Sequence, residues 1–113
     1  MKLKAIFLSA FAFFLLATST YAQKVYSVDS KYDADVKVYV ASSKYDADLK
    51  VFKVSSSYDA NSDGLWYFTS SKYDAKKKVF FVDSKYDANL IIFYVDSKYD
   101  AGWNNRSKSH LMQ

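Results

Sequence analysis

The chain has 113 residues, a formal net charge of +4 and no cysteine, and 19% of its residues are aromatic. Lys2 and Lys4 near the N-terminus account for half of that charge, and the rest is too balanced to indicate a nucleic-acid partner. Without cysteine the protein has neither disulfides nor thiol chemistry, so packing alone must stabilise what we expect to be one domain.

Residues 1–22 are predicted to be a secretory signal peptide. The two lysines precede an apolar run over residues 5–17, and the small residues Thr20 and Ala22 precede a cut before Gln23. The run is shorter than the roughly 20 apolar residues that a membrane-spanning helix needs. We therefore expect an exported protein, periplasmic or extracellular, with no stable membrane insertion after cleavage.

The rest of the chain repeats the motif Ser-Lys-Tyr-Asp-Ala. Consecutive motif tyrosines are 13 residues apart, except for one interval of 15 residues. Residues between the motifs, such as 36–40, are β-branched or aromatic and alternate with period 2, which predicts a short strand in each unit. Ser and Asp favour bends, so each motif is predicted to be a bend or a short edge strand. The six tyrosines are Tyr32, Tyr45, Tyr58, Tyr73, Tyr86 and Tyr99.

Aligning the repeats places similar side chains in columns. A valine column holds small apolar residues and one tryptophan, and an aromatic column follows it by one position. The valine column is Val25, Val38, Val51, Trp66, Val79 and Ile92. The aromatic column is Tyr26, Tyr39, Phe52, Tyr67, Phe80 and Phe93.

Residues 60–65 interrupt the repeat, with three motifs before them and three after. Asp63-Gly64 predicts a reverse turn, so we expect the chain to go out, turn back there and return. Direct stacking of the units would align the motif lysines in a like-charge ladder, which is unfavourable. We therefore expect an all-β, compact tandem-repeat fold. Its two three-repeat halves would interleave about a pseudo-twofold, with lysines of one half near aspartates of the other. A narrow β-solenoid is the alternative. The domain is predicted over 23–103, followed by a flexible polar tail at 104–113.

The segment at 43–52, Ser-Lys-Tyr-Asp-Ala-Asp-Leu-Lys-Val-Phe, resembles the repeat of a family of small uncharacterised bacterial proteins with tandem SKYDADLKVY-type repeats. The resemblance covers residues 24–103. It implies a domain of unknown function without an assigned activity, and a compact β fold that is deeply knotted in some relatives. Two repeat halves wound around each other are the kind of arrangement that produces a torus knot.

One segment has the spacing of a calcium loop. Asp59, Asn61 and Asp63 precede Gly64 as in D-x-[DN]-x-[DN]-G, but the position of the closing bidentate carboxylate is Ser70. The turn between strands is therefore the favoured interpretation, and no metal or cofactor is expected.

Catalytic chemistry is poorly supported. Asp33 with Asp35, and Asp46 with Asp48, are spaced carboxylate pairs, but identical repeats provide no unlike pair of the kind that glycosidases use. The single histidine, His110, lies in the polar tail. We therefore expect no enzymatic activity.

The conspicuous aromatic side chains have two interpretations. They could stack on sugars or peptides, or they could fill the core of a small domain, which we favour. The candidates for stacking are Tyr32, Tyr45, Trp66, Tyr73, Tyr86, Tyr99 and Trp103. The first function hypothesis is accordingly a structural or interaction module of a bacterial envelope, with an envelope protein as partner. The alternative is a small carbohydrate- or cell-wall-binding module. Exposure of the tyrosine rings distinguishes the two.

Overall fold

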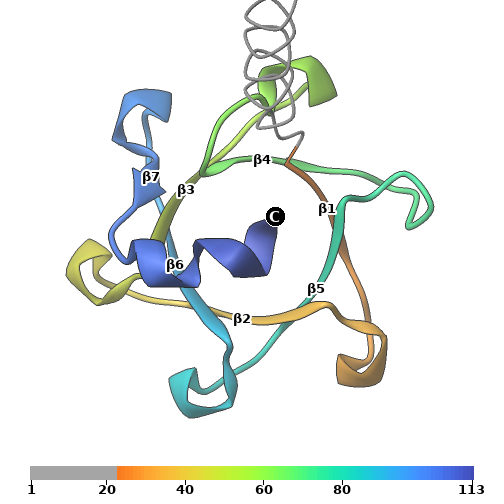
Figure 1. The fold of residues 1–113 in the computed structure, drawn as a ribbon, viewed down its shortest axis with the longest axis horizontal. Coiled ribbons are helices and arrows are strands. Elements are labelled where there is room, and N and C mark those ends of the chain that lie inside the picture. The colour runs from red at the N-terminus through yellow and green to blue at the C-terminus, as the bar shows by residue number, and fades with distance from the viewer. Residues whose placement is uncertain (1–22) are drawn as a thin grey trace, which may run out of the picture.

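Six short strands close into a parallel barrel in the computed structural model, which describes residues 23–113 (Figure 1). The predicted signal peptide lies outside the described residues. A seventh strand, β7, pairs antiparallel with β3 outside the ring. The strands are β1 (Lys24–Ser27), β2 (Val36–Val40), β3 (Leu49–Lys53), β4 (Leu65–Phe68), β5 (Lys77–Phe81), β6 (Leu90–Tyr94) and β7 (Gly102–Trp103).

Strands from the two halves of the chain alternate around the ring. The order is β4-β1-β5-β2-β6-β3, and β3 closes the ring by pairing with β4. Half a turn of such a ring exchanges the set β1–β3 with the set β4–β6. The predicted interleaving of two three-repeat halves is therefore confirmed. The solenoid alternative is wrong, because β1 pairs with β4 and β5 and not with β2.

The expectation that the chain turns back at Asp63-Gly64 is wrong. Gly64 does adopt a positive φ of 86°, but β3 and β4 on either side of it pair in parallel, with Phe52 opposite Leu65. Every other connection between consecutive ring strands passes over one intervening strand, whereas the β3–β4 connection passes over none. The strands β1–β3 form a first circuit of the ring and leave a gap between neighbours. Because the β3–β4 connection is shifted by one strand, the second circuit, β4–β6, enters those gaps.

Each motif forms a tight turn that projects outward from the ring as an arm (Figure 1). In the first arm, Ser30 Oγ accepts a hydrogen bond from the Tyr32 backbone nitrogen at 3.2 Å, and the Asp33 nitrogen donates to the Ser30 carbonyl at 3.1 Å. The predicted bends are thus present. The arms are the 3-10 turns η1 (Lys31–Asp33), η2 (Lys44–Asp46), η3 (Ser57–Asp59), η4 (Lys85–Asp87) and η5 (Lys98–Asp100), and the fourth arm, the turn at residues 71–75.

The valine column fills the barrel. Because successive side chains of a strand point to opposite faces, each strand sends one column residue inward and its aromatic neighbour outward. All six column residues, Val25, Val38, Val51, Trp66, Val79 and Ile92, are 0% exposed. Val36, Leu49 and Leu90 form a second buried layer beside them.

The C-terminal segment packs across one end of the barrel (Figure 1). Residues Arg106–Met112 form the 3-10 helix η6, and Met112 is buried in the core cluster. The backbone nitrogens of Asn104 and Asn105 donate to the Asp48 carbonyl at 2.8 and 3.0 Å, which fixes η6 to the amino end of β3. The expected flexible tail is therefore a folded cap in the structure, because its terminal apolar side chains bury against the barrel.

Candidate binding surface

The motif tyrosines lie at the tips of the arms, almost entirely in solvent. Their exposed fractions range from 85% at Tyr45 to 90% at Tyr73. The favoured interpretation, that these rings fill the core, is therefore wrong, because the valine column already occupies the interior. Tyr58, on the arm whose lysine is replaced by Ser57, is exposed as well. The candidate set had omitted it, although the repeat itself could have identified it.

A lysine lies over the ring of its neighbouring tyrosine in five arms. The Lys31 Nζ is 5.4 Å from the centroid of the Tyr32 ring, and the four other pairs have distances of 5.5 or 5.6 Å. Exposed cation–π contacts contribute about 0.5–1 kcal/mol. Motif lysines lie near motif aspartates of the other half, as expected, since Lys72 lines the same pocket as Asp33, and Lys85 the same pocket as Asp46. They do not form ion pairs, because the single ion pair within residues 23–113 joins Lys24 and Asp74.

The two tryptophans do not belong to this surface. Trp66 is enclosed in the barrel, where its indole Nε1 has no hydrogen-bond partner. Trp103, on β7, is half-buried against the core. Stacking of a ligand on Trp66 is therefore impossible in the folded state, and the exposed candidates are the arm tyrosines.

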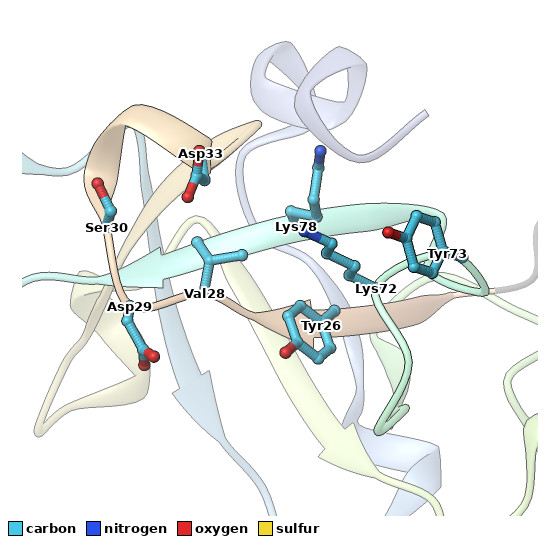
Figure 2. Close-up of a pocket in the computed structure, with 8 residues that line it drawn as sticks. All are labelled: Tyr26, Val28, Asp29, Ser30, Asp33, Lys72, Tyr73 and Lys78. Atoms are coloured by element: carbon cyan, nitrogen blue, oxygen red, sulfur yellow. The ribbon is translucent and has the colours of Figure 1, made fainter.

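A groove opens between neighbouring arms and recurs along the repeat. The Tyr26 groove, of about 420 Å³, has Tyr26 of β1 as its floor, Asp33 of η1 on one wall, and Lys72 and Tyr73 of the fourth arm on the other (Figure 2). Advancing each position by 13 residues gives the Tyr39 groove, of about 490 Å³. Its corresponding residues are Tyr39, Asp46, Lys85 and Tyr86.

Two further grooves repeat this composition. The Phe52 groove, of about 320 Å³, has Phe52 as its floor, with Asp59 and Lys98 beside it. The Phe80 groove, of about 420 Å³, has its floor in the second half of the chain, and Phe80 lies there between Asp87 of η4 and Lys31 of η1. Each groove thus combines an outward aromatic floor with a motif carboxylate from one arm and a motif ammonium from the next. These volumes lie at the lower end of the ~300–1,000 Å³ typical of small-ligand sites.

The second carboxylate of each aspartate pair joins the two halves of the chain. Asp35 Oδ2 accepts a hydrogen bond from the Lys78 nitrogen at 2.9 Å, while the Asp35 nitrogen donates to the Lys78 carbonyl at 2.7 Å. Asp48 makes the same two bonds with Ile91, at the same distances. Asn89 repeats the arrangement with Lys37 from the other half. These residues therefore hold the interleaved strands in register.

The candidate calcium ligands lie in the connection from η3 to β4. Asp59 and Asn61 are exposed, and the Asn61 amide nitrogen lies 3.5 Å from the Tyr58 carbonyl oxygen. Asp63 is half-buried beside Gly64, whose positive φ accounts for the Asp-Gly turn. Within residues 23–113, no three His, Cys, Asp or Glu side chains gather in a way that could hold a metal ion. Calcium binding by this segment stays a prediction.

A closed ring in which two halves of the chain interlace defines an all-β tandem-repeat domain. The family model of the 7(1) septoil knot domain matches residues 22–104. Because this match spans well over half of the sequence, the chain belongs to the septoil knot domain family. The resemblance to an uncharacterised, knotted repeat family is thereby confirmed. Comparisons with curated proteins and with solved structures gave no significant match. Among the described residues, no helix has the length and apolar character that crossing a membrane requires.

Proposed function

We propose that this domain is an exported, non-enzymatic binding module that holds carbohydrate, such as a cell-wall glycan, on its outer surface. The observation that carries the proposal is the exposure of the motif tyrosines, 85–90% for all six. Single exposed apolar residues need no explanation, but rings presented at equivalent places by every repeat form an ordered surface.

The chemistry between the arms suits sugars. A pyranose ring has apolar C–H faces and a rim of hydroxyls, so it needs a flat apolar surface with hydrogen-bonding groups beside it. The Tyr26 groove supplies the aromatic floor, the Asp33 carboxylate as acceptor and the Lys72 ammonium as donor. Convergent polar groups around an apolar surface are the usual composition of a ligand site.

Several features support binding without catalysis. The carboxylates of Asp35 and Asp48 accept hydrogen bonds from backbone nitrogens of the opposite half, so they have a structural role. His110 Nδ1 lies 3.1 Å from the Ser107 carbonyl within the C-terminal cap, away from the arms. The predicted signal peptide supports export, which would bring the module to an envelope glycan.

A sedimentation assay with insoluble peptidoglycan and chitin tests this proposal. The wild-type domain should pellet with at least one of the two polymers. Replacing the tyrosines of the five Lys-Tyr arms by serine should abolish pelleting, whereas replacing the same five by phenylalanine should preserve it. Thermal unfolding should be alike for the two variants, because these rings lie outside the core. Failure of the wild type to pellet with either polymer, or unchanged pelleting of the serine variant, would refute the proposal.

A second candidate, a durable structural module that docks an envelope protein, is favoured by the interlaced ring. Each strand of β1–β3 is held on both sides by strands of the other half, so neither half can leave without opening the ring. Such a module should resist proteolysis in the presence of denaturant. Its partner binding should survive the serine substitutions that abolish glycan binding.

A further inference from the structure

We propose that three neighbouring grooves form one continuous track that holds successive units of a single linear, neutral glycan chain. This inference rests on the proposed function, and it adds the length, the charge class and the path of the ligand. The three grooves are the Tyr26, Phe80 and Tyr39 grooves.

The grooves follow one another around the ring. The Tyr26 groove combines outward side chains of β1 and β5, the Phe80 groove those of β5 and β2, and the Tyr39 groove those of β2 and β6. This succession is the order β1-β5-β2-β6 of the sheet. In Figure 1 the fourth arm, η1, η4 and η2 follow each other along the same arc.

Adjacent grooves share their walls. The arm η1 contributes Asp33 to the Tyr26 groove and Lys31 to the Phe80 groove. Asp83, just before η4, lines both the Phe80 groove and the Tyr39 groove. A ligand that leaves one groove over a shared arm therefore enters the next groove directly. Each of the three grooves has an aromatic side chain as its floor.

The charge along the track favours a neutral chain. The Phe80 groove pairs Lys31 and Lys37 with Asp83 and Asp87, so positive and negative groups are equal in number. The Tyr26 groove likewise has two lysines and two aspartates, and the Tyr39 groove has two aspartates and one lysine. A polyanion would meet at least as many carboxylates as ammonium groups, and like-charge contacts weaken association. The hydroxyl and amide groups of a neutral glycan can form hydrogen bonds with both the carboxylates and the ammonium groups.

The ligand and the site are both periodic. Once one sugar occupies a groove, the next sugar of the same chain is held close to the adjacent groove, which raises its effective concentration. Affinity should therefore increase with chain length until the glycan spans all three grooves, and then level off. Linked sites of this kind can exceed the single-site affinity by about 10²–10⁴-fold.

Isothermal titration with N-acetylglucosamine oligosaccharides of increasing length tests the track. The wild type should gain about a hundredfold or more in affinity between the shortest and the longest oligomers. Phe80→Ala removes the floor of the central groove, so it should abolish most of this gain while short oligomers still bind in the outer grooves. Phe93→Ala is the matched control, because Phe93 occupies the same column on β6, is half-buried like Phe80, and lines none of the three grooves. It should retain the length dependence.

The outcomes separate the track from the proposed function. Absence of binding to every oligomer, together with failure to pellet with peptidoglycan and chitin, would refute both. Binding without length dependence, or equal losses in Phe80→Ala and Phe93→Ala, would overturn the track and leave the binding module in place. Affinity that falls steeply with added salt would also overturn it, since a neutral chain does not depend on ionic attraction.

Discussion

The barrel interior and the arms are built from the same repeat, yet they treat apolar side chains in opposite ways. Val38 is fully buried, whereas Tyr45, only seven residues later, is 85% exposed. The width of the ring explains the difference. Barrel diameter grows with strand number, and eight strands leave an interior just wide enough for side chains to fill. A six-stranded ring is narrower, so the central layer of its interior takes one residue of about valine size per strand, and the single large member of that layer is Trp66.

This comparison separates stability from surface chemistry. The interior and the connections that keep two circuits in one ring should determine whether the protein folds. The arms, which contribute no residue to the core cluster, should determine what it binds. Substitutions in the two regions should therefore have clearly different consequences.

The largest expected loss comes from Gly64→Ala, at the one connection that offsets the second circuit. A methyl group on Gly64 would lie 2.5 Å from the Lys50 carbonyl oxygen and 2.8 Å from the Gly102 backbone nitrogen. Backbone must therefore move, and the residue must also keep a φ of 86°. We expect a loss of roughly 2–5 kcal/mol in the free energy of unfolding, combining left-handed strain with overpacking.

Gly102→Ala is the control for this substitution. Gly102 also has a positive φ, of 143°, but a methyl group there would have no neighbour within 4 Å. Only the backbone strain remains, so its cost should be about 1–2 kcal/mol. Urea unfolding of both variants measures the difference. Equal losses would show that the close approach at Gly64 is unimportant.

The next prediction compares the two regions directly. Val38→Ala removes buried methyl groups from the central layer of the barrel, and its cost should be about 1.5–3 kcal/mol. Tyr45→Ala deletes a far larger side chain from an arm, yet it should change stability by no more than about 0.5 kcal/mol. Thermal or urea unfolding of the two variants measures both effects. A larger loss for Tyr45→Ala would break the distinction between interior and arms.

Repetition and charge were enough to predict the interleaving of the two halves, but not the direction of the chain. Asp63-Gly64 has the local chemistry of a reverse turn, and Gly64 does adopt positive φ. Local chemistry cannot show that the next strand re-enters the ring in parallel, because Leu65 finds its partner Phe52 through the closure of the whole barrel. The interior column was visible as a valine column, since period-2 alternation marks one face of each strand.

The candidate surface was predicted in part. The motif tyrosines were recognised as candidates but assigned to the core, because a small domain usually needs its aromatic residues there. That assignment neglected how little space a narrow ring offers. The approach of Asp33 and Lys72 from opposite halves was expected, but the aromatic floor between them was not predicted. The C-terminal cap did have a signal, namely the apolar pair Leu111 and Met112 at the end of a polar segment.

A smaller effect is expected where the two halves are joined at the base of an arm. Asp48→Ala removes the carboxylate that accepts from the Ile91 nitrogen at 2.9 Å. A hydrogen bond to a charged group contributes about 1.5–3 kcal/mol, and the partial exposure of Asp48 places the expected loss near the lower limit.

Two further variants at this arm make the prediction specific. Asp48→Asn should be close to wild type, because Asn89 makes the same pair of bonds with Lys37 from the other half. Asp46→Ala should be silent as well, since Asp46 is exposed on the arm itself. Chemical denaturation of the three variants measures the effect. A loss in Asp46→Ala that matched Asp48→Ala would assign stabilisation to the arm and contradict the separation of the two regions.

The smallest predicted effect concerns Tyr94, which lies on the inward face of β6 at the mouth of the barrel and is intermediate between the two regions. Burial raises the pKa of Tyr94 to about 12, from the ordinary value of 10.0. The Lys53 Nζ lies 4.4 Å from the centroid of its ring. The folded state therefore keeps the phenol proton at a pH where the unfolded chain releases it. Stability from this group should be complete below pH 10 and should decline as the pH rises from 10 to about 12.

Tyr94→Phe isolates this contribution, because phenylalanine packs in the same place and has no proton to lose. The difference in unfolding free energy between wild type and variant should be constant below pH 10 and should shift against the wild type above it. Partial exposure of Tyr94 lets solvent screen the phenolate, so the shift should be smaller than the loss in Asp48→Ala. Urea titrations at several pH values above and below 10 measure it. Parallel pH profiles for the two proteins would mean that the Tyr94 hydroxyl reaches solvent as freely as those of the arm tyrosines. Tyr94 would then have to be grouped with the exposed arms and not with the barrel interior.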